Sequence, residues 1–531
     1  MALIGKHTLL GAALALSASV LGAQAPAATP PKCDIGDVMK GNTARATLSF
    51  GVAQQSTGTP VAATNLKSVV KLVETPDKAA DEPVGRAYVL GEALSLWLNQ
   101  PGVKPISKRG DLGFTVNPEG TIDIVGALDS AFKIVEAAKP NCSDNTAYFR
   151  GGHKYYLDAA NNAINALNAD KLDSAEYYAT QANRLYPASP YGTMVLAGVA
   201  AKRNDTPKAL EYWNRAAELS AKDSGYRDVR RQMRANAGST YLSQAQAAAG
   251  AQRAEAARKA AEAYGQLVAV PGTTGQYLYG GRQNYQTALL LAGDTAAFVK
   301  SYGELIANPS AYGYQDLLNS AVNAARSNRN ADAVKLFEGT LVQNPYNRDA
   351  LFNLAVTYLA LDQNDKVAPV ATRLIAVDPG NPENYNLAAQ AYLRLAKAAQ
   401  TAKKTALSAA YNDSPLTWYT RGDKLPVEVT FAEFSPSENQ IVVGGTVLDR
   451  RDKIGAQVPA AKPAKGKAPA KAAASMAPKA VTLKFEALDK TGAVLGSETV
   501  TTEPLTPGKS AKFSAKITAS NAAAYRYTIV E

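Results

Sequence analysis

Histidine and cysteine are almost missing from this sequence: there are two of each in 531 residues. A zinc site needs several His, Cys or carboxylate ligands at fixed spacing. Outside the first 25 residues the only imidazole is His153, which follows Gly151-Gly152 just before a predicted helix. A lone histidine in that position is typical of a surface or capping residue, so we expect no metal site and no His-dependent catalysis.

Phosphate-binding loops are also missing, because no Gly-rich loop leads into Lys-Ser/Thr. The nearest feature, Gly280-Gly281, is explained by the start of a helix. Paired carboxylates such as Asp170 and Asp173 are expected on solvated surfaces. The sequence therefore predicts a protein that is not an enzyme and needs no cofactor. An enzyme with an unrecognised site is the remaining alternative.

Long hydrophobic runs are limited to the N-terminus. An uncharged, mostly apolar stretch over 8–22 is followed by the small-x-small pattern Ala23-Gln24-Ala25. This layout indicates a secretory signal peptide over 1–25. It is shorter than the ~20 apolar residues of a membrane span, although an N-terminal anchor helix is the alternative. We expect cleavage near Ala25, no transmembrane segment in the mature chain, and a periplasmic or secreted bacterial protein.

The two cysteines, Cys33 and Cys142, form an even pair in a chain expected to be exported. Oxidising compartments favour disulfides, so we expect these two to be joined. The bridge would tie the mature N-terminus to the first helices. Two buried free thiols are the competing interpretation.

The sequence does contain an alanine-rich helical pattern that repeats every 34 residues. The repeat is seen in several sets of equivalent positions. These are Leu317, Leu351 and Tyr385; Ala321, Ala355 and Ala389; Tyr358 and Tyr392; Pro345 and Pro379; Ala175 and Ala209; and Ala182 and Ala216. Three successive units in register predict an α-solenoid.

These positions resemble the tetratricopeptide repeat (TPR), which places large, small and aromatic residues along its first helix and ends each unit with Pro. The resemblance implies a TPR-like α-solenoid over 145–415 that binds a protein or peptide on its concave face. The best-matching units are 156–189, 190–223, 314–347, 348–381 and 382–415. The region between them keeps the pattern with drifted register, as helices over 227–248, 252–268, 277–292 and 294–307.

The resemblance also suggests site residues. Asn319 and Asn353 occupy equivalent groove positions, where related carboxylate-clamp proteins hold the C-terminal carboxylate of a peptide. The basic helpers of such a clamp are missing, since Leu318, Glu383 and Leu387 stand in their places. Hydrogen bonding to an extended peptide backbone remains. Tyrosine outnumbers phenylalanine by 26 to 11, and although most tyrosines are expected to pack within repeats, Tyr358 and Tyr385 are predicted partner contacts.

The two ends of the chain differ from this pattern. Residues 26–144 predict a divergent helical N-terminal cap, with a small separate domain as the alternative. From 425 to 531, alternating β-branched strands and turns such as Asp489-Lys490-Thr491-Gly492 predict a small β-sandwich. Its segment over 483–489, the Gly492 turn, and Pro507-Gly508 before Phe513 resemble FxLYD-type, immunoglobulin-like modules of bacterial envelope proteins.

A low-complexity Ala, Pro and Lys segment interrupts the sandwich. Residues 453–479 have a composition that cannot bury a core, and they predict a disordered basic loop that contains Lys462, Lys465, Lys467 and Lys471. The formal net charge is +11, but nucleic-acid binding usually combines basic clusters with aromatic residues. This loop has no aromatic residue, so nucleic acid is not favoured. An anionic envelope polymer, such as peptidoglycan or another anionic glycan, is the alternative partner. The first interpretation remains an exported, non-catalytic scaffold for a protein or peptide in the cell envelope.

Overall fold

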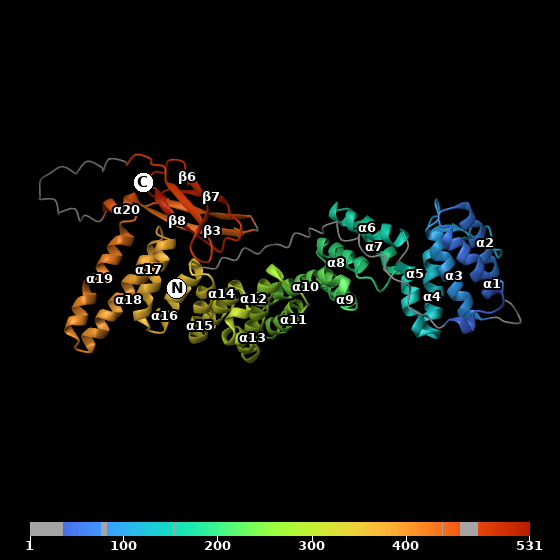
Figure 1. Ribbon diagram of the computed structural model, residues 1–531, viewed down its shortest axis with the longest axis horizontal. Coiled ribbons are helices and arrows are strands. Elements are labelled where there is room, and N and C mark those ends of the chain that lie inside the picture. Colours follow the sequence, from blue (N-terminus) through green and yellow to red (C-terminus); the bar gives the residue numbers. More distant parts are fainter. Residues whose placement is uncertain (1–34, 76–81, 152–153, 438, 457–475, 531) are drawn as a thin grey trace. The chain divides into compact units, whose positions relative to one another are not determined.

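The computed structural model describes residues 35–75, 82–151, 154–437, 439–456 and 476–530. Their contacts divide the chain into two compact units, residues 1–281 and 282–531. Helices dominate both units (Figure 1), and among the described residues antiparallel sheets occur only within 106–123 and 427–530. The predicted fold class, mainly α repeats followed by a C-terminal β-sandwich, is confirmed.

The first unit begins with four helices and a small hairpin. The helices are α1 (Gly41–Gln55), α2 (Pro60–Glu74), α3 (Pro83–Leu98) and α4 (Ile124–Ala138). Strands β1 (Ile106–Lys108) and β2 (Thr121–Asp123) pair antiparallel and enclose residues 109–120. The buried side chains of these helices belong to the same hydrophobic core as those of the helices that follow them in this unit.

After the short helix α5 (Ser143–Gly151), the helices follow one another in pairs. The pairs are α6 (Lys154–Asn168) with α7 (Leu172–Leu185), α8 (Tyr191–Lys202) with α9 (Thr206–Leu219), α10 (Arg227–Ala247) with α11 (Gly250–Val268), α12 (Gly275–Ala292) with α13 (Thr295–Ala307), α14 (Tyr314–Arg326) with α15 (Asn330–Gln343), α16 (Arg348–Ala360) with α17 (Asn364–Val377), and α18 (Pro382–Thr401) with α19 (Thr405–Asp423).

The turn inside most pairs has one left-handed residue. The residues with this positive φ are Asp170, Asn204, Gly293, Asn328, Asp362 and Lys403. In every case the next residue's N–H donates to the carbonyl five positions earlier, as Arg329 does to Ala324 at 2.9 Å. This bond satisfies a carbonyl at the helix end, and Gly, Asn and Asp adopt the left-handed conformation at least cost.

The second helix of several pairs ends in a different way, at a residue that precedes proline. Tyr186, Asn308, Asn344 and Asp378 all have φ between −135° and −140°. A following proline disfavours the helical conformation of the residue before it, so the helix stops there. The sequence therefore sets the end of each helix of a pair locally. The first helix ends at a left-handed residue, and the second ends at a residue before proline.

Small residues at the repeated positions allow the helices to pack closely. Ala321, Ala355 and Ala389 are fully buried, and Leu317 and Leu351 beside them are equally inaccessible. The 34-residue spacing found in the sequence is thus the spacing of core positions.

The last pair departs from the prediction. We expected the repeats to end at 415, but α19 continues to Asp423 and contains Pro415. Proline inside a helix usually costs ~3 kcal/mol. Here Pro415 is buried, and the rings of Trp418 and Tyr385 pack with their centroids 6.2 Å apart. We infer that this packing outweighs the lost backbone hydrogen bond.

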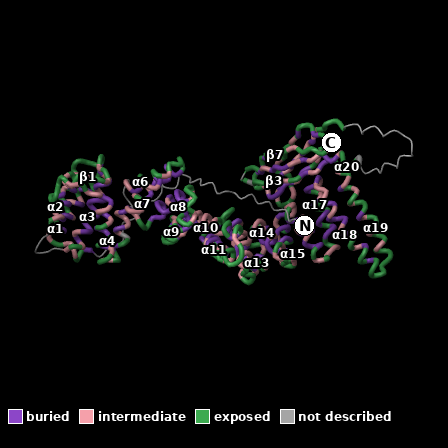
Figure 2. The backbone as a smooth tube through the Cα atoms, turned by 180° about the vertical axis from the view of Figure 1, so that it is seen from behind, coloured by how far each residue is buried: buried purple, intermediate pink, exposed green. Residues whose placement is uncertain are grey.

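The C-terminal domain consists of two three-stranded antiparallel sheets. One has the order β3 (Val427–Pro436), β4 (Gln440–Asp449), β7 (Ser510–Thr518), and the other β6 (Val494–Thr501), β5 (Thr482–Leu488), β8 (Ala524–Val530). A short helix, α20 (Arg451–Ala456), follows β4. Alternate residues of the strands form one aromatic-rich core around Phe485, Phe513 and Tyr527, which appears as buried segments of the sandwich in Figure 2.

Candidate binding face and docked sandwich

The first helices of the last three pairs, α14, α16 and α18, are neighbours and carry partly exposed amide side chains. We call this the amide face, made of Gln315, Asn319, Asn353, Asn386 and Gln390. All five are partly exposed, whereas Leu317, Leu351 and Ala389 on the same helices are fully buried. The structure thus places the two predicted asparagines on equivalent sites of adjacent helices.

The two central asparagines leave complementary groups free among the described residues. Asn319 accepts a hydrogen bond from Gln315 Nε2 through its Oδ1 at 3.1 Å, and no described residue accepts a bond from its side-chain N–H groups. Asn353 donates from Nδ2 to the Asp349 carbonyl at 2.8 Å, so its Oδ1 is the unpaired group. One donor and one acceptor on neighbouring helices match the alternating groups of an extended peptide backbone.

Apolar side chains lie between these amides. Val322, Phe352 and Val356 are partly exposed, and Leu393 on α18 is 54% exposed. A mixed surface of amides and apolar groups offers both hydrogen bonds and buried area to a peptide. The positions where a carboxylate clamp needs cations hold the buried Leu318 and Leu387 and the exposed Glu383, so this face does not rebuild a clamp.

The predicted contacts Tyr358 and Tyr385 point into the protein. They are 4% and 5% exposed. The Tyr358 hydroxyl donates to Glu338 at 2.5 Å, and that of Tyr385 donates to the Pro379 carbonyl at 3.0 Å. Burial, aided by Glu338, raises the pKa of Tyr358. Both residues support the amide face from beneath, and a direct contact with a partner stays a prediction.

The β-sandwich is docked on the turns that follow α15 and α17, a feature that sequence analysis missed. Asn344 and Asp378, which precede Pro345 and Pro379, are 0% and 2% exposed. Asn344 Nδ2 donates to the Ala523 carbonyl at 2.7 Å, and Asp378 Oδ1 accepts from the Tyr527 hydroxyl at 2.7 Å. Equivalent positions of two successive repeats therefore hold the same domain.

Tyr527 is the centre of this contact. Its oxygen also accepts from the Gly380 N–H at 2.9 Å, and the Gly380 carbonyl accepts from the Val429 N–H at 2.9 Å. A Cβ on Gly380 would lie 2.8 Å from the Tyr527 oxygen, so only glycine permits this approach. Burial and the Asp378 carboxylate hold the pKa of Tyr527 well above its usual range, which keeps the hydroxyl proton available for Asp378.

A second group of contacts surrounds this centre. The Arg348 guanidinium at the start of α16 lies 4.6 Å from the centroid of the Phe431 ring. Burial by itself would lower the pKa of Arg348. The carboxylate of Asp349, whose Oδ1 lies 2.8 Å from Arg348 Nη2, keeps this pKa above its ordinary value. Arg450 Nη1 donates to the Gly422 carbonyl at the end of α19 at 3.0 Å. The sandwich is therefore fixed at several points to the ends of α15, α16, α17 and α19, and in Figure 1 its strands lie beside the ends of α16 and α17.

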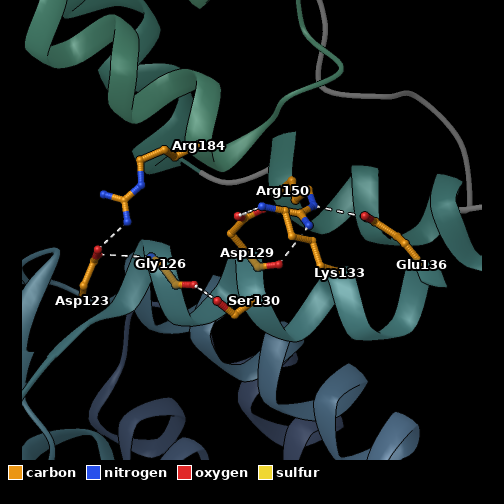
Figure 3. A network of polar contacts seen from close by, with 8 residues as sticks. All are labelled: Asp123, Gly126, Asp129, Ser130, Lys133, Glu136, Arg150 and Arg184. Carbon is orange, nitrogen blue, oxygen red and sulfur yellow. Dashed lines mark hydrogen bonds and ion pairs between the residues drawn. The ribbon is translucent and has the colours of Figure 1, made fainter. Parts of the chain in front are cut away.

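A network of ion pairs in the first unit joins helices α4, α5 and α7 (Figure 3). Arg150 of α5 pairs with Asp129 at 2.8 Å and with Glu136 at 3.4 Å, both on α4. Arg184 of α7 contacts Asp123, which caps the start of α4 through the Gly126 N–H. Every charge here meets an opposite charge within the chain, so the network holds α4, α5 and α7 together.

Some predicted sites fall outside the described residues. These are Cys33, His153, and the lysines Lys462, Lys465, Lys467 and Lys471. Cys142 is described and fully buried, but the disulfide stays a prediction, as does any role of the basic loop. In the part of the chain that is described, no cluster of three or more His, Cys, Asp and Glu side chains is arranged to hold a metal. No helix found there is both long and apolar enough to cross a bilayer.

Comparisons with known proteins identify no family. The chain matches no protein-family model and no curated protein. Among solved structures, the apo form of RapI aligns with 72% of this chain and 97% of its own, at 8% identity and a TM-score of 0.29. PilW, a type IV pilus biogenesis factor, aligns with 50% of this chain and 98% of its own, at 13% identity and a TM-score of 0.20. These scores are too low to support a shared function.

Proposed function

We propose that this chain is an exported scaffold that binds an extended segment of a protein partner on the amide face and acts without catalysis. The observation that carries the proposal is the pair Asn319 and Asn353, which present an unpaired donor and an unpaired acceptor on adjacent first helices. Their apolar neighbours Phe352 and Val356 add area for burial.

The rigid attachment of the β-sandwich supports the same proposal. Binding is tighter when the binding surface does not have to be ordered first. Asn344 and Asp378 lie in the turns that lead into α16 and α18, and Arg348 is the first residue of α16, so the sandwich holds the starts of two helices of the amide face. Export is supported by the N-terminal segment and its Ala23-Gln24-Ala25 site.

Site-specific photocrosslinking tests the proposal. A photoreactive amino acid replaces Phe352 on the amide face, and in a control chain it replaces Val342 of α15, which is 83% exposed. Both chains are expressed with their N-terminal segment and crosslinked in intact cells. We expect a defined protein adduct from position 352 only, and its loss when Asn319→Ala and Asn353→Ala are added.

Equal adducts from both positions, or none from position 352, would contradict binding on this face. Export is measured separately by the N-terminal sequence of the mature protein, which we expect to begin at Pro26. A chain that keeps its first 25 residues and stays in the cytoplasm would refute export and leave the binding result intact.

A further inference from the structure

The last helix pair is longer than its neighbours. α18 begins 34 residues after α16, in register with it, but has 20 residues where α16 has 13. Seven more residues extend a helix by ~10 Å. We call residues 395–411 the overhang, comprising the extra turns of α18, the turn at 402–404, and the first turns of α19. This end of the pair is mostly exposed (Figure 2).

The overhang carries charge of one sign. No acidic residue occurs between Glu383 and Asp413. Lys397, Lys403 and Lys404 are exposed, and none of them forms an ion pair with a described residue. Arg394, directly before the overhang, is instead paired with Asp362 at 3.1 Å. The overhang thus presents three cations without a counter-charge from the surrounding repeats.

One of these lysines occupies an unfavourable backbone position. Lys403 has φ = 56° in the left-handed turn where the other pairs carry Asp, Asn or Gly. An L-residue that is not Asn, Asp or Gly pays roughly 1–2 kcal/mol there. Asn would adopt this conformation at lower cost, so we infer that the lysine is kept for its cation.

Apolar groups accompany the lysines. Leu393 is 54% exposed and Leu407 is 41% exposed. Along α18, Asn386, Gln390, Leu393 and Lys397 follow at intervals of four, three and four residues, which places them on one side of the helix. The overhang therefore continues the amide face as a basic end with apolar contacts.

We propose that the overhang binds an acidic segment of the partner protein, next to the part held by the amide face. This inference rests on the proposed function and adds the chemistry of the partner: Asp or Glu side chains interspersed with apolar residues. Charge complementarity calls for an acidic partner, and continuity with the amide face favours a polypeptide over an anionic lipid surface.

The test uses the mature full-length chain and a fluorescein-labelled peptide of Leu, Ser and Asp residues. A second peptide has Asn in place of each Asp, and binding is followed by fluorescence anisotropy at low and high salt. We expect the Asp peptide to bind about tenfold tighter or more at low salt, with most of this preference lost at high salt. The triple variant Lys397→Glu, Lys403→Glu, Lys404→Glu should remove the preference.

The matched control reverses three other exposed lysines of the same unit, Lys300, Lys335 and Lys490, to Glu. It changes the net charge equally and should leave the preference within about twofold. Equal binding of the two peptides, or an equal loss in the control, would overturn the proposal. So would binding to phosphatidylglycerol vesicles that depends on the three overhang lysines, without preference for the Asp peptide.

Failure of this inference and failure of the proposed function are distinguishable. If the overhang is not used, the adduct from position 352 persists in the triple variant and the Asp preference is absent. If the amide face is not used, the adduct from position 352 is also absent in the chain whose overhang lysines are unchanged.

Discussion

At the scale of single residues, buried polar groups decide how the sandwich is held. Asn344 and Asp378 end second helices, where they lie before proline, and their side chains also bond to the β-domain. Removing one partner of a buried hydrogen bond costs more than the bond contributes, because the other partner remains desolvated. Tyr527 makes two such bonds, so it is the most sensitive position of the contact.

Tyr527→Phe is expected to lower the free energy of unfolding of the second unit by roughly 2–4 kcal/mol. It removes the bond to Asp378 Oδ1, while Asn381 and Asn384 still donate to Oδ2, and it leaves the Gly380 N–H without its partner. Denaturant unfolding followed by tryptophan fluorescence measures the change. Tyr525→Phe is the control, since Tyr525 is buried on the same strand and has no hydroxyl bond among the described contacts. Equal effects of the two variants would show that the bonds to Asp378 and Gly380 contribute little.

A second buried group, Glu92 of α3, makes the first unit sensitive to pH. It is 7% exposed, and burial raises its pKa to about 8, partly offset by a hydrogen bond with Tyr88. The folded state therefore favours the protonated form. The stability this provides is complete below the unfolded pKa, near 4.5, and is lost as pH rises through 8.

Calorimetric melting of the wild type and Glu92→Gln between pH 5 and pH 9 tests this. We expect the Tm of the wild type to fall relative to that of the variant across this range, because the amide stays neutral. Glu82→Gln, at a partly exposed carboxylate before α3, should follow the wild type. Parallel curves for wild type and Glu92→Gln would mean that Glu92 is already ionised in the fold.

At the scale of elements, the repeat is defined by how its helices end. The left-handed turn residues Asp170 and Asn204 are 34 apart, and so are Asn328 and Asp362. These turns need no distant contact, because the residue type and one backbone bond set the conformation. The last pair breaks the pattern with Lys403 and with a helix seven residues longer than α16.

Lys403→Asn should stabilise the last pair by about 0.5–1 kcal/mol, because asparagine adopts positive φ at lower cost. Thermal unfolding measures the gain. Lys404→Asn, at the neighbouring position with φ = −88°, is the control and should give no gain. The same Lys403→Asn variant should bind the acidic peptide more weakly, and stabilisation without weaker binding would remove the backbone argument for the overhang.

At the scale of the whole molecule, the N-terminal helices share one core with the helix pairs that follow, while the sandwich has its own core. The fully buried Cys142 lies in a short 3-10 turn (Pro140–Cys142) between α4 and α5. A bridge to Cys33 would close a loop of more than a hundred residues, for which the chain-entropy model gives roughly 4–5 kcal/mol.

We expect the mature protein from an oxidising compartment to show no free thiol by alkylation and mass spectrometry. Cys142→Ser should then lower the Tm of the first unit relative to the wild type. Under reducing conditions, where the bridge in the wild type is open, the same substitution should lower the Tm by less. Two alkylated cysteines in the unreduced protein would support buried free thiols instead.

The sequence by itself determined the helix pairs, their period and the strands of the sandwich. Their signals are local or periodic: Ala321, Ala355 and Ala389 at equal spacing, Asn or Asp in the turns, and alternation in the strands. It also pointed to Asn319 and Asn353, because equivalent positions of a repeat share a face.

Only the tertiary structure decided where the sandwich docks, that Tyr358 and Tyr385 are buried, and that α19 runs through Pro415. Each of these depends on contacts between residues far apart in the chain, such as Asp378 with Tyr527. The burial energy of such contacts outweighs local preference, and a single sequence carries no periodic signal for it.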